Sequence, residues 1–211
     1  MVAGSHKSPA AQRGFHVGLP EGFIELPLDE VDVESAEVET LVAAVRKRFG
    51  MSADELVAET AASFAAMGEL IGTSGVDYAA VAFYRSPDDP QRPIMMTLTG
   101  TALPSSHASP LQAVTELHNL HMDSGKYDTV EELKLPVGPA VATVAEAASS
   151  VELTGETSRV LTRQLSAWVP DHEGTTVGAI SVSTNSFQDW ERICILALDI
   201  FETFEWEPID G

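Results

Sequence analysis

Hydrophobic residues recur three or four positions apart, the spacing of an amphipathic helix, in four stretches of the chain. This pattern predicts helices over residues 36–49, 52–71, 110–123 and 186–206. The last helix has the strongest pattern, and one of its faces carries Trp190, Ile193, Ala197, Phe201 and Phe204. We expect that face to pack on a sheet, against Ile180 and Val182. In the third helix, the residues expected to face inward are Leu111, Val114 and Leu117, with Leu120 or Met122.

Between the predicted helices, hydrophobic residues recur at every second position, which is typical of β-strands with one buried face. Strands are predicted over residues 22–28, 76–86 and 94–103, and three further extended segments over 130–148, 159–170 and 175–186. Pro27 cannot donate to a sheet ladder, so the first strand belongs at an edge. The alternation of polar and apolar residues indicates antiparallel pairing. The predicted fold class is α+β, a mainly antiparallel sheet of about five to six strands sandwiched by helices, with a long C-terminal helix.

Length and composition suit one globular domain, since the chain has 211 residues of which 44% are hydrophobic. We expect a flexible tail over residues 1–20, a single α+β domain over 21–207 and a short tail over 208–211. The first stretch lacks the apolar region of a secretory signal, so the expected location is the cytoplasm. No apolar run reaches the roughly 18 residues that span a bilayer, so no membrane span is expected.

Charge narrows the choice of partners. The chain has 32 acidic and 12 basic residues, a formal net charge of −20, and such a surface repels the phosphates of nucleic acids. The acidic residues crowd positions 25–39 and 202–210, which predicts a docking surface for a basic protein partner. The predicted partner-binding residues are Asp29, Glu30, Asp32, Glu34, Glu202 and Glu205. The alternative is that these acidic residues serve solubility alone.

Two histidines give the most suggestive cluster for metal binding. His118 and His121 are three residues apart, so they share one face of the third predicted helix. A metal site needs further ligands, and none has a fixed place near these two in the sequence. We therefore expect both histidines on a solvated helix end, where they suit the helix dipole, and we expect no metal and no cofactor.

No catalytic residues are predicted. The single cysteine, Cys194, lies on the apolar face of the last helix, where it suits core packing better than nucleophilic chemistry. The chain has no G-x-S-x-G motif and no set of serine, histidine and aspartate whose geometry follows from spacing. It also lacks a phosphate-binding loop, because the glycines at 72–75 precede a strand rather than a helix.

The opening stretch GFIELPL, at 22–28, and the closing stretch GAISVSTNSFQDWERICILALDIFETFEW, at 178–206, together resemble a known family. They are similar to uncharacterised actinobacterial proteins with a PsbP-like α/β/α sandwich, a fold related to that of LpqN-type lipoproteins. The resemblance implies a binding or scaffolding role and carries over no site residues. With the acidic surface, it predicts a non-enzymatic protein-binding or accessory module. The alternative is an enzyme or small-ligand binder with a pocket between the sheet and the helices.

Overall fold

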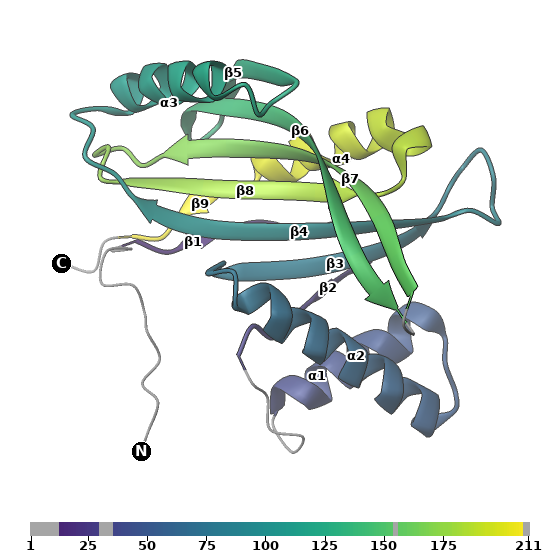
Figure 1. Cartoon of the computed structure of the whole chain (residues 1–211). Helices are drawn as coiled ribbons and strands as arrows, with labels where there is room; N and C mark the ends of the chain where they lie inside the picture. The colour runs from purple at the N-terminus through teal and green to yellow at the C-terminus, as the bar shows by residue number, and fades with distance from the viewer. Residues whose placement is uncertain (1–12, 30–35, 154–155, 209–211) are drawn as a thin grey trace.

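A computed structural model describes residues 13–29, 36–153 and 156–208, and these residues form one large and one small antiparallel sheet with four α-helices (Figure 1). The large sheet has seven strands, two of them long (β6 and β7), and helices pack on both of its faces. The order across it is β2 (Phe23–Glu25), β3 (Tyr78–Arg85), β4 (Pro93–Pro104), β8 (Thr176–Thr184), β7 (Glu156–Pro170), β6 (Gly138–Leu153) and β5 (Thr129–Leu135). The predicted α+β class is confirmed, and β2 is an edge strand as expected.

The large sheet has seven strands, where the sequence predicts about five to six. The difference arises in the segment 130–148, which was expected to be one extended piece. The chain turns at Pro136 and Val137, and it divides there into β5 and β6. Gly138 follows the turn with a backbone φ angle of 144°, a conformation that residues other than glycine rarely adopt. The turn therefore depends on Gly138, and the alternation of polar and apolar residues over 130–148 does not predict a turn there.

Helices α1 (Ala36–Phe49) and α2 (Asp54–Gly72) cover one face of the sheet at the β2–β3 end. Their shared core with the sheet contains Ile24, Leu41, Val45, Val57, Ala61, Phe64, Ala79 and Val81. The helix predicted over 36–49 is confirmed with the same bounds. Helix α2 approaches the backbone closely, because a β-carbon on Gly68 would lie 2.0 Å from the carbonyl oxygen of Pro27. Small residues on this helix therefore bring it against the segment that follows β2.

Helix α4 (Trp190–Glu202) covers the opposite face, preceded by one turn of 3-10 helix over Phe187–Asp189 (Figure 1). The predicted packing is confirmed: Ile193, Ala197 and Phe201 share a core with Ile180 and Val182. The regular helix is shorter than predicted, since it ends at Glu202. Phe204, expected on the helix, lies beyond its end and is still buried.

A small sheet of β1 (Phe15–His16) and β9 (Glu205–Trp206) brings the two ends of the described chain together. Phe15 stacks on Phe204 with ring centroids 5.3 Å apart. The amide of Glu207 donates to the carbonyl of Gly14 at 2.9 Å. Residues from position 13 onward, which the sequence assigns to a tail ending at 20, are thus part of the packed fold.

Helix α3 (Pro110–Ser124) lies against β5, β6 and β7, with Ser109 as its N-cap and Gly125 ending it at φ 61°. Its predicted inward face is partly wrong. Ala113, Val114 and His121 are buried, and Leu117 is partly buried. The side chains expected inward that are instead exposed are Leu111 at 70%, Leu120 at 63% and Met122 at 57%. The buried face of α3 includes His121, and histidine is not an apolar residue, so the spacing of apolar residues does not predict this face.

Candidate functional site

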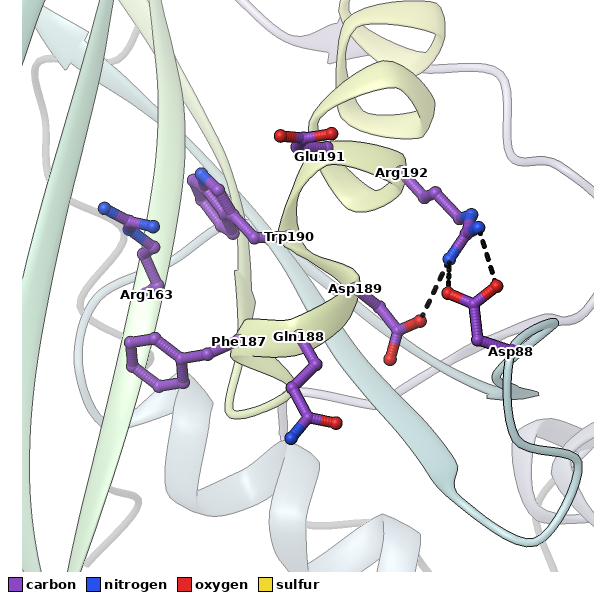
Figure 2. Close-up of a pocket in the computed structure, with 8 residues that line it drawn as sticks. All are labelled: Asp88, Arg163, Phe187, Gln188, Asp189, Trp190, Glu191 and Arg192. Atoms are coloured by element: carbon purple, nitrogen blue, oxygen red, sulfur yellow. Dashed lines mark hydrogen bonds and ion pairs between the residues drawn. The ribbon is translucent and has the colours of Figure 1, made fainter.

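A pocket of about 410 Å³ lies beside the start of α4 (Figure 2). Its lining is mostly polar and charged: Asp88, Arg163, Phe187, Gln188, Asp189, Trp190, Glu191 and Arg192. The residues come from the β3–β4 loop, from β7 and from the first turns of the closing helix. Its chemistry therefore depends on whether these charges are free or already paired.

Asp189 is the central charge of this pocket, and its side chain is fully buried. It accepts hydrogen bonds from the hydroxyl of Ser86 at 2.8 Å and from Nε of Arg92 at 3.2 Å. Arg192 Nη1 lies 3.5 Å from Asp189 Oδ1 and also donates to Asp88 at 2.6 Å (Figure 2). Hydrogen bonding to Arg192 lowers the pKa of Asp88. These contacts tie the β3–β4 loop to the start of α4.

The opposite wall of the pocket is formed by Arg163 and Trp190. The guanidinium of Arg163 lies 5.0 Å from the centre of the indole ring, a cation–π contact. Its Nε also lies 3.2 Å from Oε1 of Glu146 on the neighbouring strand. Both arginines of the pocket are thus engaged by carboxylates of the protein, and the arrangement is that of a structural network rather than of a substrate site.

A second hollow, which we call the β2–α1 groove, has a volume of about 580 Å³ and lies between the edge strand and the first helix. Its apolar lining residues are Leu19, Phe23, Ile24, Leu26, Pro27, Ala36, Leu41 and Ala44. The remaining lining residues are Thr40 and the exposed acidic residues Glu25, Asp29 and Glu37. Among the described residues that line the groove, none is basic. The groove thus has an apolar floor and an acidic rim.

One rim carboxylate is held in place by a tyrosine. The hydroxyl of Tyr78 donates to Oε1 of Glu25 at 3.1 Å. Burial of the phenol and the nearby charge of Glu25 both raise the pKa of Tyr78 far above its ordinary value. The phenol therefore remains protonated and continues to donate to Glu25, which holds this side chain in place at the rim.

Known proteins resemble this chain only weakly. No family model and no curated protein sequence matches the chain. Among solved structures, the fold is loosely similar to LpqN of Mycobacterium tuberculosis, described as involved in cell envelope biogenesis. The TM-score is 0.42 with 12% sequence identity, over 96% of this chain and 88% of LpqN. In the part of the chain that the structure describes, no helix is long and apolar enough to cross a membrane.

The acidic residues predicted to bind a partner fall in different places. Asp29 lines the β2–α1 groove, whereas Glu30, Asp32 and Glu34 lie outside the described residues. Glu202 ends α4 and Glu205 begins β9, so both belong to the layer on the other face of the sheet. The groove also contains Glu25 and Glu37, which belong to the predicted acidic stretch at 25–39 but are not among the six residues named as partner-binding.

The two histidines of α3 differ in their surroundings. His118 is partly exposed, but His121 is only 7% exposed, so the expectation that both lie on a solvated helix end is wrong for His121. The ring of His121 lies 4.8 Å from that of Tyr127 and 4.6 Å from that of Trp168. Its Nε2 is buried without a hydrogen-bond partner among the described residues. Nor does the described part of the chain contain three histidine, cysteine, aspartate or glutamate residues grouped to hold a metal.

Burial makes His121 a pH-dependent contributor to stability. It lowers the pKa of the imidazole below its ordinary value of about 6.5. As the pH falls through that value the unfolded chain binds the proton first, so the free energy of unfolding should decrease. Urea unfolding between about pH 8 and pH 5.5 should show this decrease, and it should be smaller in His121→Phe. The matched control His118→Phe should keep the decrease of the parent. Equal losses in the parent and in His121→Phe would contradict the prediction.

Proposed function

We propose that the chain is a protein-binding module that takes a basic segment of a partner protein into the β2–α1 groove. The observation that carries the proposal is the combination of an apolar floor with the exposed carboxylates of Glu25, Asp29 and Glu37. An apolar floor supplies the burial that drives association, and the charged rim selects the partner.

The charge of the groove indicates the chemistry of that partner. The whole chain carries a formal charge of −20, so acidic partners are repelled at a distance and basic ones are attracted. At the groove itself, lysine or arginine side chains would meet the three carboxylates while their apolar neighbours fill the floor. A segment that alternates basic and apolar residues meets both requirements.

The position of the groove favours an extended segment. It follows β2, the edge of the large sheet, and β2 is hydrogen-bonded only to β3 among the described strands. An edge strand presents main-chain donors and acceptors on its open side, which a partner can use by adding a strand. In an extended segment, side chains alternate between two faces, so the apolar ones can point to the groove and the basic ones to its rim.

The proposal can be tested with a fluorescein-labelled peptide that alternates leucine and lysine, followed by fluorescence anisotropy. We expect saturable binding that weakens steeply between about 50 and 500 mM salt, because salt screens exposed charges. A peptide with glutamate in place of each lysine should not bind. In the groove variant Glu25→Gln/Asp29→Asn/Glu37→Gln, binding should weaken by about tenfold or more.

A matched control removes the same charge at the opposite edge of the sheet. Asp128, Glu131 and Glu132 are exposed and lie on or just before β5, the far edge strand. The control variant is Asp128→Asn/Glu131→Gln/Glu132→Gln, and it should bind the lysine peptide nearly as the parent does. If both variants lose affinity equally, attraction to the whole acidic surface explains binding and the groove does not.

A further inference from the structure

Ser105, His107 and Glu116 lie in contact with one another where the loop after β4 meets the start of α3, and we call these three residues the Ser105 relay. The hydroxyl of Ser105 forms a hydrogen bond with Nδ1 of His107. Nε2 of His107 lies 3.2 Å from Oε2 of Glu116, one turn and a half into the helix. Gln112 donates from Nε2 to the other oxygen, Oε1, of Glu116 at 2.7 Å. The carboxylate is therefore held from both sides, by a histidine and by an amide.

The carboxylate of Glu116 favours one tautomer of His107. It is an acceptor only and lies 3.2 Å from Nε2, so it favours the ring form with the proton on that nitrogen. In the neutral ring, Nδ1 then has a free lone pair, and its partner is the hydroxyl of Ser105. The serine proton thus points at a base whose tautomer is set by a carboxylate. This is the logic of a serine–histidine–acid triad, with the two ring nitrogens exchanged relative to the familiar protease arrangement.

The backbone holds the relay in position. The amide of Ser105 donates to the carbonyl of Thr175 at 2.7 Å, and the amide of His107 donates to that of Gly174 at 3.1 Å. Gly174 has φ at 76°, and a β-carbon there would lie 2.5 Å from the carbonyl oxygen of His107, so the fit depends on glycine. The side chain of His107 is 19% exposed and Ser105 is partly exposed. The loop that carries Ser105 and His107 is therefore attached to the segment between β7 and β8, and both side chains are still reachable from solvent.

We propose that Ser105 is an activated nucleophile that hydrolyses small, activated esters. Its Oγ attacks the ester carbonyl carbon and forms a new C–O bond while the hydroxyl proton passes to Nδ1 of His107. The bond to the leaving group breaks, and the departing aryloxide takes that proton. Water then attacks the acyl-serine, gives its proton to Nδ1, and Ser105 recovers it as the acid is released. Glu116 is a positioning residue, which orients the imidazole and stabilises its charged form.

The chemistry of the relay indicates the substrate class. A serine with a histidine base attacks an ester most readily when the leaving group is good, which favours small aryl esters over unactivated ones. Neither pocket described above includes Ser105, His107 or Glu116 in its lining. The chemistry is separate from the β2–α1 groove and does not depend on the proposed binding function.

The test uses two probes on the full chain: 4-nitrophenyl acetate hydrolysis, and labelling by a fluorophosphonate with the adduct located by peptide mass spectrometry. The adduct should form on Ser105, and labelling should slow in acid, because only the neutral imidazole can accept the serine proton. His107→Gln should slow labelling by about a hundredfold or more. Glu116→Gln, which keeps the size of the side chain but removes its charge, should slow labelling by about tenfold and change the pH profile.

Ser106 supplies the matched control, because it is the exposed neighbour of Ser105 and has no described contact with the histidine. Ser106→Ala should label and hydrolyse as the parent does, whereas Ser105→Ala should do neither above background. Circular dichroism of each variant shows that the fold is retained. An adduct spread over Ser106 and other serines, or labelling of Ser105 that is indifferent to His107→Gln and to pH, overturns the proposal.

Discussion

Replacing Phe201 by alanine should lower the free energy of unfolding by about 3–5 kcal/mol. The side chain is fully buried between α4 and the large sheet, in the core that also contains Ile180, Val182 and Phe204. Truncation removes the apolar burial of an aromatic ring and leaves a cavity that the surrounding strands cannot close. Because whole domains are stable by only about 5–15 kcal/mol, the variant should retain little of its stability.

Urea unfolding followed by tryptophan fluorescence measures this effect. Ile195→Ala is the matched control, since Ile195 lies on the same helix and is 62% exposed. It should change the free energy of unfolding by no more than about 0.5 kcal/mol. A small loss for Phe201→Ala, comparable to that of the control, would show that the helix does not hold the sheet as described.

Asp189→Asn should lower the free energy of unfolding by about 2–3 kcal/mol. The carboxylate is fully buried and accepts from Ser86 and Arg92, with Arg192 close by. Asparagine keeps the size but loses the charge, and its amide group would point a donor at one of the donors already present. The negative charge also lies at the N-terminus of α4, where it suits the helix dipole.

The control for this prediction is Asp88→Asn, which removes a charge from the same network at an exposed site. The side chain of Asp88 is 61% exposed and its ion pair with Arg192 is open to solvent. Its removal should barely move the unfolding midpoint, because exposed ion pairs contribute little. If Asp189→Asn and Asp88→Asn have the same free energy of unfolding, the contacts of the buried Asp189 do not anchor the β3–β4 loop.

Hydrophobic periodicity predicts the frame of this fold well where one face of an element is apolar throughout. Helix α1 has the predicted bounds, and α4 buries the predicted stripe on Ile180 and Val182. The same reasoning fails in α3, because leucines lie on more than one side of that helix. The buried face of α3 includes His121, which packs against Trp168 of β7 and Tyr127 of the loop after the helix. The sequence of the helix alone does not show these two contacts.

The candidate sites are less accessible to sequence reasoning, since they depend on which segments meet in space. The acidic cluster at 25–39 marks the region of the groove, but only the packing of α1 beside β2 decides that Glu25, Asp29 and Glu37 form its rim. The relay is similar: Ser105 and His107 are neighbours in a loop, and Glu116 joins them only because α3 turns it back toward that loop. Spacing alone gives no reason to group the three.

The pairing of β1 with β9 has a consequence for the order in which this protein can fold during its synthesis. Phe15 is synthesised almost 190 residues before its stacking partner Phe204 and the strand with which it pairs. Domains form from the N-terminus as they are translated, and contacts so distant in sequence are slow to close. The nascent chain must therefore carry β1 unpaired until the other described strands and helices have been made, and the small sheet is among the last of them to assemble.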